Sequence, residues 1–298
     1  MNKKKNKVLV TILFGDQFVE HWNKFCKESW NEYAKKNGYD IVLIKRRIDE
    51  SKIGTSRQVN WQKLLILEAP EVKQYEDIVW VDADIVINAL NSPCIVEANN
   101  NDKVGVVKYS DAYNAELKEG GLARQVSSNA SADMRSIDPH ISYHERYRMA
   151  GLPDDIDDFI NAGVLVLKKH HAELLRYVYD SYKENIWTAK ENLPLSYHLL
   201  STDNVNSIDP RFNKILDIEI VHHYPFLVID GIKIPERFLF LSVNAIFVNS
   251  FFLHFIGGAT RPFIQLIIRG GGYPDIFQYI NANATENEYV VGDKKLSF

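Results

Sequence analysis

The chain alternates between short apolar runs and longer stretches in which apolar residues recur at helical spacing. Four runs in the first 107 residues are rich in β-branched and aromatic residues and predict buried strands, at 8–14, 39–44, 78–81 and 104–107. Residues 19 to 36 place their apolar side chains at helical spacing, and Gly38 is a typical C-terminal stop. This strand, helix, strand opening predicts a parallel sheet with helices on its faces.

The rest of the chain shows weaker patterns. Residues 58–69 predict a short helix ended by Pro70, with Lys63 on a different face from its apolar residues. Further buried strands are expected at 159–167 and 251–256, an edge strand at 215–221 and an amphipathic helix over 168–186. In residues 109–158 the apolar residues recur at neither helical nor strand spacing, which is typical of a functional loop region.

Composition narrows the class of protein. With 298 residues, 46% of them apolar, the chain is long enough for one large domain or two small ones. A net charge of −4 shows no basic excess of the kind that favours nucleic acid. No apolar run approaches the roughly 20 residues of a membrane helix. Two cysteines without metal-site spacing fit a reducing compartment, so we expect a cytoplasmic protein and leave peripheral membrane association open.

Two acids, Asp82 and Asp84, follow the apolar strand at 78–81 directly. In open α/β sheets ligands bind at the carboxyl ends of strands, and a bend in this triplet lets both carboxylates reach one cation. Hard carboxylate oxygens at this spacing suit Mg²⁺ or Mn²⁺ carrying a diphosphate. A solvated strand end is the alternative, because 39 acidic residues produce such triplets by chance.

Other polar residues adjoin the later strands. Asn161 can hold a sugar hydroxyl by donating and accepting at once, and Gly163 permits close approach of a ligand. The pair Gly257 and Gly258, followed by Arg261, offers the backbone N–H groups and the counter-charge that a diphosphate needs.

Four stretches in this order resemble the GT-A fold glycosyltransferases, most closely the retaining families of lipopolysaccharide α-galactosyltransferases and α-xylosyl- and α-mannosyltransferases. They are residues 61–63, 79–87 and 161–164, and His254-Phe255-x-Gly257. The likeness spans roughly residues 7 to 265. It implies one Rossmann-like α/β domain over 1–298, with a mostly parallel central sheet flanked by helices. Its donor-binding half would cover about 1–108, its acceptor-binding half about 109–280, and a polar tail 281–298.

The resemblance also implies roles for individual residues. Mn²⁺ or Mg²⁺ would be ligated by Asp82, Asp84 and His254, while Thr11 would face the base of the donor. Donor phosphates or sugar would meet Lys63 and Arg261. The pair Asp203-Asn204 resembles the Asp-Gln pair of those families, so Asp203 and Asn161 would hold hydroxyls and Asn204 would lie near the anomeric carbon. Two departures stand out: one extra residue precedes Arg261, which replaces a Lys, and Asn204 replaces a Gln.

The activity implied is transfer of a sugar from a nucleoside-diphosphate sugar to a glycan or other hydroxyl acceptor, with retention. UDP is favoured over GDP as the donor nucleotide. If the enzyme inverts instead, Asp157, Asp158 and Asp203 are the candidates for the base. Two alternatives stay open. Residues 82–86 also fit the motif of haloacid dehalogenase-type phosphatases, with Asp82 as nucleophile, and a non-catalytic sugar- or nucleotide-binding protein on this fold is the other.

Overall fold

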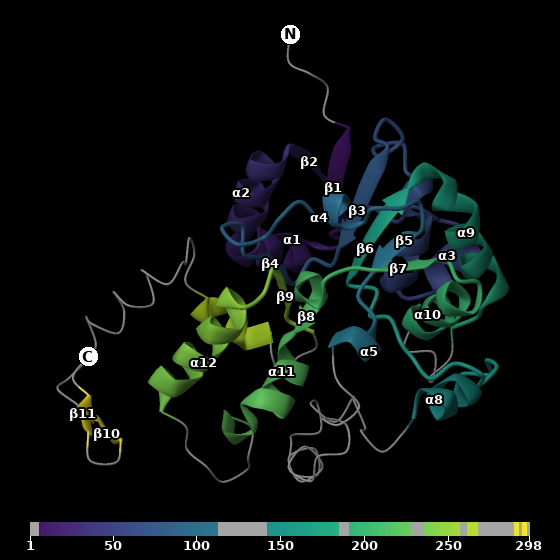
Figure 1. The fold of residues 1–298 in the computed structure, drawn as a ribbon. Helices are drawn as coiled ribbons and strands as arrows, with labels where there is room; N and C mark the ends of the chain where they lie inside the picture. Colours follow the sequence, from purple (N-terminus) through teal and green to yellow (C-terminus); the bar gives the residue numbers. More distant parts are fainter. Residues whose placement is uncertain are drawn as a thin grey trace.

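The computed structural model describes residues 6–112, 142–184, 191–227, 235–256, 261–267, 289–291 and 294–296. Its centre is a six-stranded sheet in the order β2-β1-β3-β6-β5-β7 (Figure 1). The strands are β1 Lys7–Ile12, β2 Tyr39–Ile44, β3 Asp77–Val81, β5 Val104–Val106, β6 Val164–Lys168 and β7 Val205–Ser207. Three of the five pairings are parallel, and β6 runs antiparallel between β3 and β5. The expected α/β domain with a mostly parallel central sheet flanked by helices is confirmed.

A second, three-stranded sheet lies below the carboxyl ends of β1 and β3 in Figure 1. It consists of β4 Ile85–Ile87, β9 Phe252–His254 and β8 Lys214–Ile215, with β9 in the middle. His254 is in register with Ile85 of β4 and with Ile215 of β8. Because β4 follows β3 after only three residues, the chain passes from one sheet to the other through Asp82, Ala83 and Asp84.

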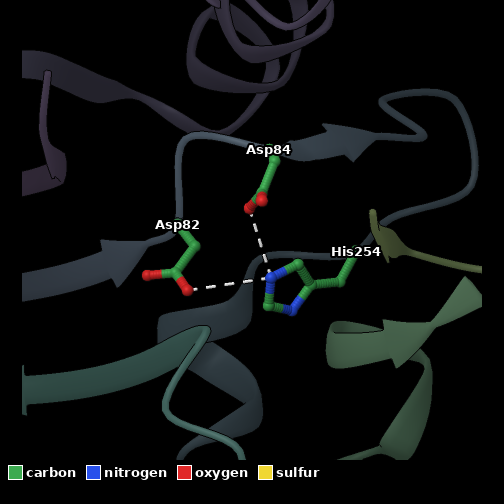
Figure 2. A group of neighbouring side chains, drawn as sticks. All are labelled: Asp82, Asp84 and His254. Carbon is green, nitrogen blue, oxygen red and sulfur yellow. Dashed lines mark ion pairs between the residues drawn. The ribbon is translucent and has the colours of Figure 1, made fainter. Parts of the chain in front are cut away.

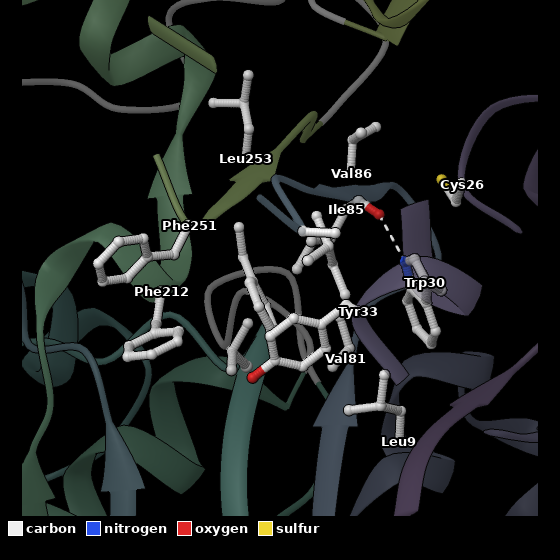
Figure 3. Close-up of a cluster of buried hydrophobic side chains, with 14 of the residues drawn as sticks. Leu9, Cys26, Trp30, Tyr33, Val81, Ile85, Val86, Phe212, Phe251 and Leu253 are labelled. Atoms are coloured by element: carbon white, nitrogen blue, oxygen red, sulfur yellow. Dashed lines mark hydrogen bonds between the residues drawn. The ribbon is translucent and has the colours of Figure 1, made fainter. Parts of the chain in front are cut away.

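Helices cover both faces of the large sheet. The alternation along β1 divides its side chains, so that Leu9 packs with the helices α1 Asp16–Phe25 and α2 Lys27–Asn37, while Val8 and Val10 face the other way. The opposite face is covered by η1 Val59–Glu68, α9 Ala172–Ser181 and α10 Asn192–Ser201. Each face therefore carries its own apolar cluster, and part of the α1–α2 cluster is drawn in Figure 3.

Shorter elements and the C-terminal helices complete the described chain. They are α3 Lys52–Ser56, α4 Ile95–Ala98, α5 Tyr109–Ala112, α8 Tyr143–Met149, η3 Lys169–His171, η4 Pro210–Asn213, α11 Leu216–His223, η5 Pro225–Leu227, α12 Glu236–Val248, η6 Arg261–Leu266, β10 Tyr289–Val291 and β11 Lys294–Leu296. None of the helices in the described part of the chain combines the length and apolar character needed to cross a bilayer.

Three element predictions need correction. The helix expected over 19–36 is two helices, which meet at Cys26, although Gly38 ends the second one at φ 74° as expected. The edge strand expected at 215–221 is wrong: β8 ends at Ile215 and the helix α11 follows. In α11 the apolar residues Leu216, Ile218 and Ile220 alternate with Asp217 and Glu219. Because all five side chains are buried, the sequence of this helix shows no amphipathic period. The helix after β6 ends at Ser181, before the expected residue 186.

Candidate active site

Asp82, Asp84 and His254 converge where the chain leaves the large sheet (Figure 2). The Asp82 N–H donates to the Gly163 carbonyl at 2.8 Å, which fixes the end of β3 against the start of β6. The His254 Nε2 atom lies 3.2 Å from Asp84 Oδ1 and 3.7 Å from Asp82 Oδ2. One donor atom from each residue lies within 4.8 Å of the other two. The expected metal ligands are thus brought together.

A buried asparagine orients the imidazole of His254. The Asn213 Nδ2 group donates to the backbone oxygen of Asn161 at 3.0 Å and to its Oδ1 at 3.1 Å. Asn213 Oδ1 therefore faces His254 and accepts from Nδ1–H at 3.0 Å. With its proton on Nδ1, a neutral His254 presents the Nε2 lone pair to the two carboxylates. A cation held between these three groups would stabilise that arrangement.

Gly163 leaves the space that His254 occupies. A Cβ atom at this position would lie 2.4 Å from His254 Cε1 and 2.8 Å from Asn161 Oδ1, both far inside normal contact distance. The close approach that the sequence suggested at Gly163 is therefore made, in this structure, by the histidine ring.

Lys63 is a buried cation beneath the acidic loop, which consists of Asp82, Ala83 and Asp84. Its Nζ atom donates to Asp82 Oδ1 at 3.0 Å and to the Ala162 carbonyl at 3.1 Å, and it lies 2.8 Å from Glu191 Oε1. Burial on its own would lower the pKa of Lys63, but the carboxylates of Asp82 and Glu191 outweigh burial and hold the pKa above its usual value. Only 2% of the Lys63 side chain is exposed, so the side of η1 that carries it is buried as well.

Asp82 uses its two carboxylate oxygens differently. Oδ1 accepts from Lys63 and from the indole N–H of Trp80, the latter at 2.8 Å. Oδ2 faces His254. The donor set of two carboxylates and one imidazole nitrogen therefore fits a divalent metal ion, with Lys63 offsetting part of the negative charge from below.

The remaining candidates from the sequence fall in different places. Asn161 belongs to the site, where its Oδ1 accepts from the Gly163 N–H at 2.9 Å. Thr11 is fully buried in β1, and its hydroxyl has no hydrogen-bond partner among the described residues. Arg261 begins η6, but its side chain lies outside the described part of the structure, as do Gly257 and Gly258.

Asp203 and Asn204 lie away from the cluster. β7 pairs in parallel with β5, which places Asn204 at the level of Asp77, the first residue of β3. The length of β3 separates that level from Asp82 by about 16 Å, in addition to the width of the intervening strands. Asp203 is 87% exposed and pairs with Lys103 at 2.8 Å. Their assignment to the reaction centre is therefore corrected, because the register of β7 puts them at the opposite end of the sheet.

Four other polar residues adjoin the site and were missed in the sequence. Glu191 pairs with Lys63, and Asn192 Oδ1 accepts from the Ala162 N–H at 3.1 Å. These two form an acid and amide pair of the same kind as Asp203-Asn204, and that likeness was the signal available for them. Asn213 and Asp217 had no sequence signal. Asp217 follows β8, and burial raises its pKa to about 6.

Comparison with known proteins gives matches only at the level of structure. No family model matches the sequence, and no curated protein does. The solved structure of a glycosyltransferase involved in the glycosylation of the major capsid of PBCV-1 matches with a TM-score of 0.50 and 14% identity, over 87% of this chain and 97% of that one. Two further matches are the WbbM bifunctional glycosyltransferase (TM-score 0.47, 13% identity, 87% of this chain and 47% of that one) and the glycosyltransferase GlyE of Streptococcus pneumoniae TIGR4 (0.45, 11%, 94% and 64%). The chain has a glycosyltransferase fold.

Proposed function

We propose that the protein is a metal-dependent glycosyltransferase. It moves a sugar from a nucleoside-diphosphate sugar, with UDP favoured over GDP, to a hydroxyl group of a glycan or other acceptor. One observation carries this proposal: Asp82, Asp84 and His254 converge at the carboxyl end of β3 on a glycosyltransferase fold. That is the edge at which open α/β sheets bind ligands, and the donor set fits Mn²⁺ or Mg²⁺.

The reaction builds negative charge on a departing diphosphate, and a divalent ion bound here supplies Lewis-acid stabilisation of that charge. Asp82, Asp84 and His254 would hold the ion. Lys63 fixes Asp82 through Oδ1, which leaves Oδ2 facing His254, and Asn213 holds Nδ1 of His254, which leaves Nε2 facing the two carboxylates. In a retaining transfer the acceptor attacks from the face that the phosphate leaves. The phosphate then takes the acceptor proton, and no protein base is required.

We place the donor in the half formed by residues 1–108 and the acceptor against the half formed by 109–280. The nucleobase would lie at the carboxyl end of β1, where Thr11 is buried and Phe14 is 40% exposed. The Arg47 guanidinium lies 5.2 Å from the centre of the Phe14 ring, which leaves an aromatic and cationic edge suited to a base and its phosphates. Asn161, Arg261, Gly257 and Gly258 remain proposed contacts of the sugar and diphosphate.

The phosphatase alternative gains no support from the geometry. A haloacid dehalogenase-type enzyme needs a second acidic pair at the end of a later strand. Asp154 and Asp155, the acids considered for that role, are exposed in the loop after α8. One oxygen of Asp82, the would-be nucleophile, accepts from both Lys63 and Trp80.

Thermal unfolding with nucleotides tests the proposal. We expect UDP or GDP to raise the melting temperature of the wild type only when Mn²⁺ is present, while CMP does not. A ligand at about 100 times its dissociation constant adds roughly 2.7 kcal/mol, which is a readily measured shift. Asp84→Asn should abolish the response, because it removes one ligand charge. Asp203→Asn is the matched control and should respond like the wild type.

Two outcomes contradict the proposal. The first is stabilisation by Mg²⁺ with beryllium fluoride and by no nucleotide, which would favour the phosphatase. The second is a full Mn²⁺-dependent nucleotide response in Asp84→Asn. A third outcome is a nucleotide response in a protein that neither transfers the sugar to any acceptor nor hydrolyses the donor. This outcome would favour the non-catalytic binding protein.

A further inference from the structure

The junction of α1 and α2 contacts the backbone that carries the acidic loop. The Cys26 thiol donates to the Ala83 carbonyl at 3.3 Å. The Trp30 indole N–H donates to the Ile85 carbonyl at 2.9 Å, a bond drawn in Figure 3. Ser29 Oγ accepts from the Ile87 N–H at 3.2 Å. Three neighbouring side chains therefore hold three backbone groups of one five-residue segment.

The spacing on the two sides matches. Residues three and four apart lie on one face of a helix, which brings Cys26, Ser29 and Trp30 together. Ile85 and Ile87 are alternate residues of β4, so their backbone groups point to the same edge, and Ala83 lies in the turn directly before this strand. β4 is an edge strand of the three-stranded sheet, paired on its other side with β9. Cys26 at the junction and the α2 side chains of Ser29 and Trp30 thus satisfy backbone groups that no neighbouring strand reaches.

Two of these contacts flank Asp84. Ala83 lies between Asp82 and Asp84, and Ile85 follows Asp84 and is in register with His254. The Phe255 N–H also donates to the Asp84 carbonyl at 3.0 Å, which couples the two strands beside the ligands. A shift of the Ala83 or Ile85 carbonyl would therefore move Asp84 relative to both Asp82 and His254.

We infer that Cys26 and Trp30 are positioning residues of the metal centre: their hydrogen bonds to Ala83 and Ile85 set the bend that aims both carboxylates at one ion. The inference rests on the proposed metal-dependent function. It also gives the unpredicted break between α1 and α2 a role, because the break places the Cys26 thiol against the loop. Supporting groups of this kind typically change metal affinity 10- to 100-fold when they are removed.

The chain contains its own control for the packing of these side chains. Trp22 lies in the same apolar cluster as Trp30, is as deeply buried, and contacts it edge-on with ring centres 5.6 Å apart. Its indole N–H, however, has no hydrogen-bond partner in the described part of the chain. Trp30→Phe and Trp22→Phe remove the same volume from one cluster, and only the first removes a bond to the loop.

The test is Mn²⁺ binding, measured with UDP present by the electron paramagnetic resonance signal of free Mn²⁺. Melting temperatures without metal are recorded in parallel. We expect both Trp→Phe variants to melt at similarly lowered temperatures, because each leaves a cavity. Only Trp30→Phe should weaken Mn²⁺ binding, by about tenfold or more. Equal Mn²⁺ affinities for Trp30→Phe and Trp22→Phe would overturn the inference.

A second pair of variants decides the matter if Trp30→Phe does not fold. Cys26→Ala removes the donor to the Ala83 carbonyl, whereas Cys26→Ser keeps one. We expect weakened Mn²⁺ binding in the first and recovery in the second, and wild-type affinity in Cys26→Ala would contradict the role of the thiol. A wild type that binds no Mn²⁺ would instead contradict the proposed function, so the two failures are distinguishable.

Discussion

At the scale of single residues, the site depends on a side chain that does no chemistry itself. Asn213 donates to Asn161 and accepts from His254, and these contacts leave its amide group one orientation. That orientation decides which nitrogen of His254 carries the proton, and therefore which nitrogen a metal ion meets. Because Asn213, Asn161 and His254 share one network, a change at any of them reaches the other two.

Asn213→Ala should lower Mn²⁺ affinity 10- to 100-fold, because His254 loses the acceptor that fixes its ring and tautomer. Asn213→Asp keeps an acceptor opposite Nδ1 and should lose less. Isothermal titration with Mn²⁺ and UDP measures both variants. Asn206→Ala is the control. Asn206 Nδ2 donates to the side chain of another asparagine, Asn99, at a distance of 2.7 Å, and this pair lies away from the cluster. Unchanged affinity in Asn213→Ala would show that Asn213 does not control His254.

The residues of the site differ in how far the sequence reveals them. Asp82 and Asp84 are visible because they follow an apolar strand directly, and His254 was placed by resemblance alone. Asn213 gives no signal, since an amide in a turn is common on any surface, and Glu191 offers only the likeness of Glu191-Asn192 to the pair Asp203-Asn204. Asp203 and Asn204 have the right residue types, but strand register decides position, and register cannot be read from a single strand's composition.

At the scale of elements, strands were more predictable than helices. β1, β2, β3 and β9 are short buried runs with clear limits, and their sequence pattern suffices. The short helix expected over 58–69 is present as η1, whereas α11 was expected as a strand. Both elements are buried on several sides, including at Lys63 and Asp217, so their apolar and polar positions do not separate into faces. Packing from several sides removes the periodicity on which such predictions depend.

The turn between β6 and α9 makes stability depend on pH through His171. Its Nδ1 accepts from the Lys168 N–H at 3.0 Å and its Nε2 lies 2.7 Å from the Asp102 carbonyl. Burial, together with neighbouring His170 and Lys168, lowers its pKa to about 4, and the Asp102 carbonyl and carboxylate only partly oppose this. The unfolded chain binds the proton from about pH 6.5 downward. Protonation therefore favours unfolding between pH 6.5 and 4, and stability falls as the pH falls through that window.

Between pH 7 and pH 5 this single group should remove about 2 kcal/mol from the free energy of unfolding. Urea unfolding of the wild type and of His171→Gln at both pH values isolates it, because glutamine keeps a donor and an acceptor but does not titrate. The wild type should lose about 2 kcal/mol more than the variant over this interval. Parallel losses in the two proteins would show that His171 is not the group responsible.

At the scale of the whole molecule, the site lies where two sheets meet. β3 belongs to the large sheet and β4 to the small one, and the three residues between them include both acids. β9 then returns from a distant part of the chain to place His254 opposite Ile85. The alternating strands and helices of the sequence predicted the α/β class. The antiparallel insertion of β6 and the second sheet depend on long-range pairings that no local pattern contains.

We propose that Asp82, Asp84 and His254 hold the metal ion that carries the donor diphosphate. Anomalous diffraction at the manganese edge, from crystals grown with Mn²⁺ and UDP, tests it most directly. We expect an anomalous peak within bonding distance of an oxygen of Asp82, an oxygen of Asp84 and Nε2 of His254, with the diphosphate on its open side. Bound UDP with no peak between these three residues, or with manganese held elsewhere, would contradict it.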